Sequence, residues 1–232
     1  FTDFANDCAQ QSDCPYQGEG GGTQVAVQLR SLFAKLDQAP LKSRDGRQIT
    51  GAFVRSAVLS YLYFPSTDYP KLRDALKQLV KSGDVEPIVA LSDERKGRQA
   101  DGHYRYNAFD SYFAVTCLDR QFMKSPQEVQ ALGSAWQKSA PTFGSNLAWG
   151  LLPCSNWPVR AVGQSKVEIS NAVAPILIVS RTHDPATPVA WAKNLNTEIP
   201  NSGLITWDSR GHTAYHQGSE CIDDAVDTYL LQ

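Results

Sequence analysis

The chain has 232 residues, a formal net charge of −2 and 42% hydrophobic residues. That length is enough for one or two domains with a real core, and the composition is that of an ordinary globular protein. The near-neutral charge gives no electrostatic reason to expect a nucleic acid or an anionic membrane surface as partner. No apolar run approaches the roughly 18 residues that a membrane-spanning helix needs, so no membrane span is predicted in this segment.

The N-terminal region predicts helix. Residues 1–15 show a short helix and a loop, and the glycine-rich residues 16–22 predict a linker, because they lack the lysine and the strand context of a phosphate loop. Residues 23–36 predict an amphipathic helix with Thr23 as its N-cap, since apolar residues recur there at helical spacing.

Further helices are predicted up to residue 139. Thr50 caps one over 51–63, which Pro65 stops, and others follow over 68–80 and 86–91, before a polar loop over 92–106. A capping box, Ser125 to Glu128 with proline at the first helical position, opens a helix that runs to about residue 139.

The C-terminal region alternates strand and helix. A short apolar run from Ile176 to Val179 predicts a buried parallel strand, and a second strand spans 204–207. A helix near 190–197 separates them, and a last helix spans 220–231. In that last helix we expect three aspartates to form a solvated face and three apolar residues to pack inward: Asp223, Asp224 and Asp227, against Ile222, Val226 and Leu230.

An acid and a histidine follow these two strands. Asp184 comes just after the first strand and His212 just after the second. Open α/β sheets gather their chemistry at the carboxyl ends of strands, and in α/β-hydrolases the triad acid precedes the triad histidine along the chain. A carboxylate that orients an imidazole base is the arrangement a serine hydrolase needs. The alternative is an ordinary loop histidine beside an aspartate that caps a helix.

The other histidines give weaker signals. His183 is adjacent to Asp184, and since adjacent residues after a strand tend to point apart, we expect it to be structural or a pocket wall. His212 and His216 have the spacing of a zinc pair, but Thr213 stands where the zinc-peptidase motif needs glutamate. We therefore predict neither a metal site nor a cofactor. Hydroxyls at Thr182, Thr187 and Ser209 could hydrogen-bond around the acid or only stabilise turns.

Several segments resemble the tripeptidyl-aminopeptidase-like branch of the α/β-hydrolases, secreted serine peptidases of the proline iminopeptidase clan. They are THDPATP (182–188), GHTAY (211–215), CIDDAVDTYL (221–230), AVTCLD (114–119), LLPCSNWPV (151–159) and DFANDCAQQSDCP (3–15). The resemblance implies the C-terminal part of an α/β-hydrolase fold with a large helical cap. Residues 1–22 would end a core segment and linker, 23–164 form the cap, and 165–232 carry the acid, Asp184, and the base, His212.

The resemblance also implies an enzyme that hydrolyses peptides from a free N-terminus through an acyl-enzyme, outside the cell or at its envelope. The chain contains no G-x-S-x-G nucleophile motif. We therefore expect the serine in a missing N-terminal half, upstream of the point matching Phe1, and an isolated chain that is inactive. An ester or lipid hydrolase and a non-catalytic binding module are the alternatives, because fold alone does not fix function.

The cap would hold the substrate. Enzymes of this clan bind the α-amino group with cap carboxylates, and Asp110 and Asp119 are the candidates, with Glu94 nearby. Three aromatic residues could line an apolar subsite, although core packing is the stronger expectation for each: Phe143, Trp149 and Trp157.

Five cysteines bear on the redox state. Cys8 and Cys14 flank a short loop and could close a ring, and Cys117 and Cys154, in the two segments that match the lid of the family, could pair. Cys221 would then be left over, with a partner expected in the missing half. The alternative is that all five are reduced and act as small hydrophobes.

Overall fold

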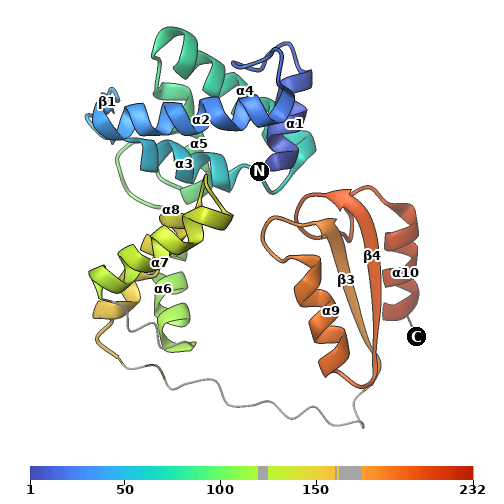
Figure 1. The fold of residues 1–232 in the computed structure, drawn as a ribbon. Helices are drawn as coiled ribbons and strands as arrows, with labels where there is room; N and C mark the ends of the chain where they lie inside the picture. Colours follow the sequence, from blue (N-terminus) through green and yellow to red (C-terminus); the bar gives the residue numbers. More distant parts are fainter. Residues whose placement is uncertain (120–124, 160, 162–173, 232) are drawn as a thin grey trace.

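The structure is a computed structural model, and it describes residues 1–119, 125–159, 161 and 174–231. Figure 1 shows two parts. The helical part runs from the N-terminus to residue 156, and the α/β part, residues 174–231, holds two strands flanked by two helices. The predicted division at residues 164 and 165 lies outside the described residues.

Five helices and a small hairpin open the helical part. They are α1 (Thr2–Gln10), α2 (Gly21–Gln38), β1 (Leu41–Lys42), β2 (Gln48–Ile49), α3 (Gly51–Ser60), α4 (Pro65–Ser82) and α5 (Glu86–Lys96). Their apolar faces form one core, in which Phe4, Leu29, Phe33, Tyr61 and Leu76 are fully buried. Burying such side chains stabilises a fold by about 1.5–3 kcal/mol each, so this core holds the five helices together.

The start of α2 corrects the predicted linker. The helix begins at Gly21 with Gly20 as N-cap, so Thr23 lies inside it and is not the cap. A Cβ on Gly22 would lie 2.7 Å from the backbone nitrogen of Asn6. Glycine is therefore needed because α1 crosses α2 at backbone distance, and the division predicted at residue 22 falls inside α2.

Other predicted boundaries in this region were also wrong. The helix predicted over 51–63 ends at Ser60. The helix predicted from residue 68 begins at Pro65, because proline is tolerated at the first helical position, where its missing N–H costs nothing. The loop predicted from residue 92 begins five residues later, because α5 continues to Lys96 and ends at Gly97 with φ +67°. The predicted caps Thr50 and Ser125 are confirmed, the latter in a complete capping box.

The rest of the helical part is smaller. It consists of α6 (Ala108–Asp119), α7 (Pro126–Ser139), α8 (Gly144–Trp149) and the 3₁₀ helix η1 (Leu152–Asn156). A disulfide between Cys117 and Cys154 joins α6 to η1, and a second one links Cys8 to Cys14 beside α1. Both pairs match the expected ones, so the fully reduced alternative is wrong; Cys221 is free and exposed.

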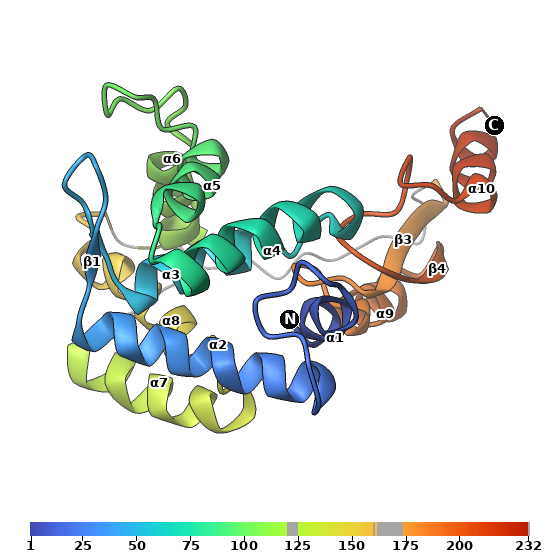
Figure 2. The ribbon, with the colours of Figure 1, turned by 90° about the horizontal axis from the view of Figure 1, so that it is seen from above.

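The α/β part follows the predicted order. It contains β3 (Ile176–His183), α9 (Val189–Glu198), β4 (Ser202–Arg210) and α10 (Glu220–Leu230). The strands pair in parallel from Ile176 opposite Ser202 to His183 opposite Arg210. The inward face expected for α10 is confirmed only for Ile222, since Leu230 at the end of the helix is 65% exposed. Figure 2 shows α1 beside this part. Asp3 of α1 forms an ion pair with Arg210 at 3.2 Å.

Candidate active site

The parallel pairing brings Asp184 and His212 together. Each follows the carboxyl end of its strand, β3 or β4, and these ends lie side by side in the sheet. The Nδ1 atom of His212 lies 3.0 Å from each carboxylate oxygen of Asp184, across 28 residues of sequence. The two residues singled out from the sequence therefore form a hydrogen-bonded pair.

The Asp184 carboxylate is buried among donors. Its Oδ1 accepts from the backbone N–H groups of Ala186 and Thr187, both at 2.8 Å. Its Oδ2 accepts from the Thr187 hydroxyl at 3.0 Å and from the Thr213 N–H at 3.3 Å. Burial by itself would raise the pKa of Asp184, but the hydrogen bonds to Thr187, Ala186 and His212 outweigh it, so the pKa lies below its ordinary value.

An ionised Asp184 fixes the tautomer of His212. A carboxylate only accepts hydrogen bonds, so Nδ1 of a neutral His212 must carry the proton and Nε2 must hold a free lone pair. Within the described chain Nε2 makes no hydrogen bond, and the side chain is 26% exposed. The ring packs edge-to-face on Tyr63 at 5.3 Å, and the backbone N–H of His212 donates to the Tyr63 carbonyl at 2.8 Å. The open nitrogen can therefore take a proton from an approaching group.

The loop that carries His212 is held by groups from β3. Gly211 has φ +114°, and a Cβ there would lie 2.6 Å from the Arg181 guanidinium, so only glycine fits. Arg181 is buried on β3 and donates to the carbonyls of Arg210 and Gln217, at the two ends of the loop. Burial lowers the pKa of Arg181.

Helix α10 also supports this loop. The carboxylate of Asp227 accepts from the Tyr215 hydroxyl at 2.6 Å, and Asp223 accepts from the His216 N–H at 2.7 Å. The expectation that these aspartates form only a solvated face was therefore wrong for two of the three. A β-turn-like loop exposes N–H groups that need acceptors, and a helix beginning just after it supplies them.

The remaining histidines and hydroxyls lie outside the pair. The ring of His183 is 3.4 Å from Asp3, and that of His216 is 67% exposed and 3.8 Å from Asp223. Thr182 donates to Asp208, so of the three hydroxyls proposed to surround the acid only Thr187 contacts it. Among the described residues no group of three or more His, Cys, Asp or Glu side chains could hold a metal ion.

The substrate-binding candidates are exposed and lie apart from the pair. Asp119 ends α6, and Asp110, in its first turn, lines a cavity of about 350 Å³. No contact joins either one to Asp184 or His212 in the described part of the chain. Glu94 lies on α5, not in a loop, and forms an ion pair with Lys71 at 3.1 Å.

The aromatic candidates divide between packing and exposure. Phe143 is buried and packs edge-to-face on Phe1 at 5.2 Å, which is a core role. Trp149 is 42% exposed and Trp157 is partly buried. None of the three lines the larger cavity of about 630 Å³, whose wall includes Tyr63, the residue that packs on His212.

Tyr63 and Arg181 were not predicted as site residues. Tyr63 lies beyond the end of α3, and only the meeting of the two parts of the structure places it on His212. The sequence does mark Arg181 as unusual, because it is a charged residue within the mostly apolar strand β3. A charge in a buried strand needs partners, and here the partners are the carbonyls of the histidine loop.

Comparisons with known proteins agree on one group. Residues 140–232 match the family model described as "TAP-like protein", which includes both strands and the Asp184–His212 pair. No helix in the described part of the chain has the length and apolar character to cross a membrane.

Three curated relatives align with most or all of the chain. Carboxylesterase B of Mycobacterium tuberculosis is 32% identical over 100% of this chain and 44% of its own length. Serine protease Hip1 of the same species is 30% identical over 100% of the chain and 45% of its own length. Tripeptidyl aminopeptidase of Streptomyces lividans is 29% identical over 91% and 39%. The chain thus spans less than half the length of these relatives and corresponds to their C-terminal part, and its residues 140–232, which carry the Asp184–His212 pair, are a TAP-like domain of the α/β-hydrolase fold.

Proposed function

We propose that this chain supplies the acid and the base of a serine hydrolase that cleaves short peptides from a free N-terminus. The observation that carries the proposal is the Asp184–His212 pair, with Nδ1 bound to a buried carboxylate and Nε2 open. The names of two relatives, a serine protease and a tripeptidyl aminopeptidase, support the peptide substrate.

In this mechanism Nε2 of His212 takes the proton of a serine hydroxyl as that oxygen attacks the substrate carbonyl. Asp184 stabilises the imidazolium that forms, and the imidazolium then protonates the leaving amine. The chain has no G-x-S-x-G motif, so the serine comes from another segment, which we propose is an N-terminal half packed against this chain. Two exposed apolar side chains on α9 support such a contact, Trp191 at 62% and Leu195 at 43% exposure.

The similarity to these relatives supports two further proposals, on the cap and on the location of the enzyme. We propose that residues 21–164, beginning with α2, form a cap over the site, that residues 1–20 and 165–232 belong to the hydrolase core, and that Asp110 and Asp119 are the candidates for holding the α-amino group. Two disulfides support a location outside the cell or at its envelope, where thiols are oxidised. An esterase activity is the second candidate, because one relative is named a carboxylesterase.

The test uses the complete translation product of the reading frame that contains this sequence. We expect release of p-nitroaniline from a tripeptidyl anilide with a free amino group, little release when that amino group is acetylated, and slow hydrolysis of a short acyl ester. His212→Ala should lower kcat by about 10⁴-fold or more. His216→Ala, a change to an exposed histidine in the same loop, should leave kcat within a few-fold.

Three results would contradict the proposal. They are a His212→Ala enzyme as active as the wild type, faster hydrolysis of the ester than of the peptide, and equal rates on free and acetylated peptides. A fluorophosphonate probe should label the complete product on serine and leave the isolated 232-residue chain unlabelled. Specific labelling of the isolated chain would show that the nucleophile lies within it.

A further inference from the structure

The cavity whose wall includes Tyr63 is largely apolar. Its volume is about 630 Å³, and its walls include Leu59, Tyr63, Phe64, Phe109 and Tyr112. Tyr63 forms part of this wall and also packs on the His212 ring, so this one residue contacts both the cavity and the Asp184–His212 pair. A cavity of this size can hold a substituent as large as a phenylpropyl group.

One cation in the wall of this cavity, Lys96, forms no salt bridge within the described residues. Lys96, the last residue of α5, lines this cavity and also the 350 Å³ cavity beside it. It is partly buried, and that burial lowers the pKa of its ammonium group. Its ammonium lies 5.4 Å from the centre of the Phe53 ring, and no salt bridge reaches it within the described residues.

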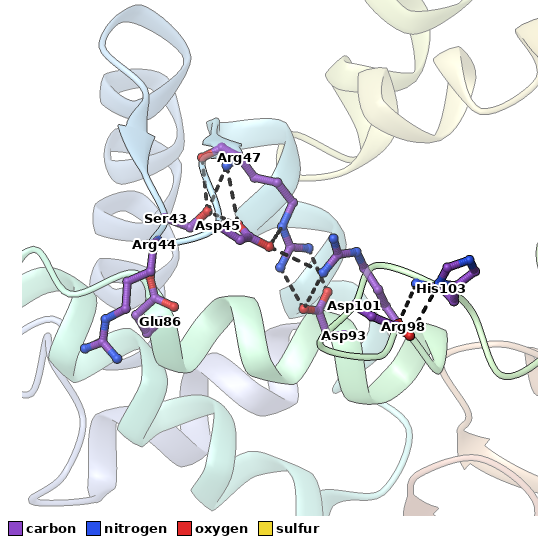
Figure 3. Close-up of polar contacts among 9 residues, drawn as sticks. All are labelled: Ser43, Arg44, Asp45, Arg47, Glu86, Asp93, Arg98, Asp101 and His103. Atoms are coloured by element: carbon purple, nitrogen blue, oxygen red, sulfur yellow. Dashed lines mark hydrogen bonds and ion pairs between the residues drawn. The ribbon is translucent and has the colours of Figure 1, made fainter.

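Two carboxylates that precede Lys96 on α5 are occupied by other cations, and no ion pair within the described residues joins Lys96 to Asp110, which lines the 350 Å³ cavity with it. Asp93 receives two hydrogen bonds of 2.7 Å from the Arg47 guanidinium and lies 3.6 Å from Arg98, as Figure 3 shows. Its neighbour Glu94 pairs with Lys71. The α5 surface therefore satisfies its acids without using Lys96.

The other cation in the cavity wall is also occupied. Arg95 forms an ion pair with the buried carboxylate of Asp68, and its guanidinium lies 4.3 Å from the centre of the Tyr61 ring. Of the two cations in the cavity wall, Lys96 is thus the one that forms no salt bridge within the described residues. A partly desolvated ammonium costs free energy until an anion reaches it, and an apolar surround makes that pairing stronger than it would be in water.

We propose that this cavity binds an apolar or aromatic group that carries a carboxylate, with Lys96 as its counter-ion. The carboxylate comes either from an acidic side chain of the substrate or from the free C-terminus of a short peptide. Binding in the cavity stands independently of catalysis, whereas the consequence for substrate choice rests on the proposed hydrolase function.

Binding is tested in the complete translation product by calorimetric titration with 3-phenylpropionate and its neutral isostere 3-phenylpropanamide. Wild type should bind the carboxylate about tenfold more tightly than the amide, the size of effect expected for one partly buried charge pair. Lys96→Met should remove that preference and leave the affinity for the amide within twofold. Lys96→Arg should keep most of it, and the control Lys35→Met, at an exposed lysine of α2, should change nothing.

A kinetic arm identifies the source of the carboxylate. If it is a side chain, kcat/KM should fall about tenfold when glutamate is replaced by glutamine in the substrate, in wild type but not in Lys96→Met. If it is the peptide C-terminus, amidation of that terminus should have this effect. Equal affinity of wild type and Lys96→Met for 3-phenylpropionate would overturn the proposal, whether or not the protein hydrolyses peptides.

Discussion

Asp184→Asn tests whether the buried carboxylate organises the site. The side chain is 2% exposed, and its two oxygens accept hydrogen bonds from four groups besides His212. An asparagine has the same shape but only one acceptor oxygen and no charge. The substitution therefore changes the hydrogen bonding of the pair with little change in packing.

The contacts set the expected loss. The best asparagine rotamer keeps its oxygen at the Oδ1 position, where the N–H groups of Ala186 and Thr187 still donate to it. Its NH₂ group then faces the Thr213 N–H, which is left without an acceptor, and the bond to His212 loses its charge. One unsatisfied donor and one weakened charge-assisted bond together cost about 2–4 kcal/mol of unfolding free energy.

The loss should depend on pH in a defined direction. Because the folded state lowers the pKa of Asp184, the carboxylate contributes its full stability above the unfolded value of about 3.9 and loses it as the pH falls through the lower folded value. Urea unfolding followed by circular dichroism should therefore give a constant difference in unfolding free energy, the gap, between wild type and Asp184→Asn from pH 8 to pH 5. The gap should narrow below about pH 4.

Thr187→Val is the graded control. It removes only the hydroxyl bond to Oδ2, leaves the two backbone donors in place, and should cost about 1 kcal/mol. A gap under 1 kcal/mol for Asp184→Asn, or a gap that stays the same at pH 3, would refute the reasoning. In the complete enzyme the same Asp184→Asn change should lower kcat by about 10⁴-fold, since the asparagine no longer selects the proton on Nδ1.

Two further predictions concern the backbone and the disulfides. Gly211→Ala should destabilise the protein by about 1–3 kcal/mol through its positive φ and further through overlap with its neighbours, measured by urea unfolding. Gly218→Ala shares the positive φ but has open space, so it should cost less; equal losses would argue against the overlap. Replacing Cys117 and Cys154 by alanine should cost about 4 kcal/mol, given their separation of 37 residues. Cys221→Ser, at a free and exposed thiol, should unfold like wild type, and a double alanine variant as stable as wild type would contradict the estimate.

The sequence determined the local structure where the signal is local. Apolar spacing and caps placed α3 and α7, and the capping box at Ser125 gave the first residue of its helix. The apolar run after Pro175 and the acid and histidine beyond the two strands placed Asp184 and His212 at neighbouring strand ends. Each of these depends on contacts within a few residues or on the single rule that parallel strands end at the same edge.

Tertiary structure decided what depends on residues distant in sequence. Gly21 and Gly22 belong to a stretch that predicts a linker when only its neighbours are considered, but both lie in α2, and α1 crosses at backbone distance at Gly22. Asp223 and Asp227 have the spacing of a solvated face, yet they bind a loop that folds back on α10. Tyr63 contacts His212 because the two parts of the structure meet there. Lys96 forms no salt bridge within the described residues, since Arg47 and Lys71 pair with the two acids that precede it on α5. Such contacts depend on how whole elements meet, and that meeting is set by the buried core as a whole, not by any local pattern.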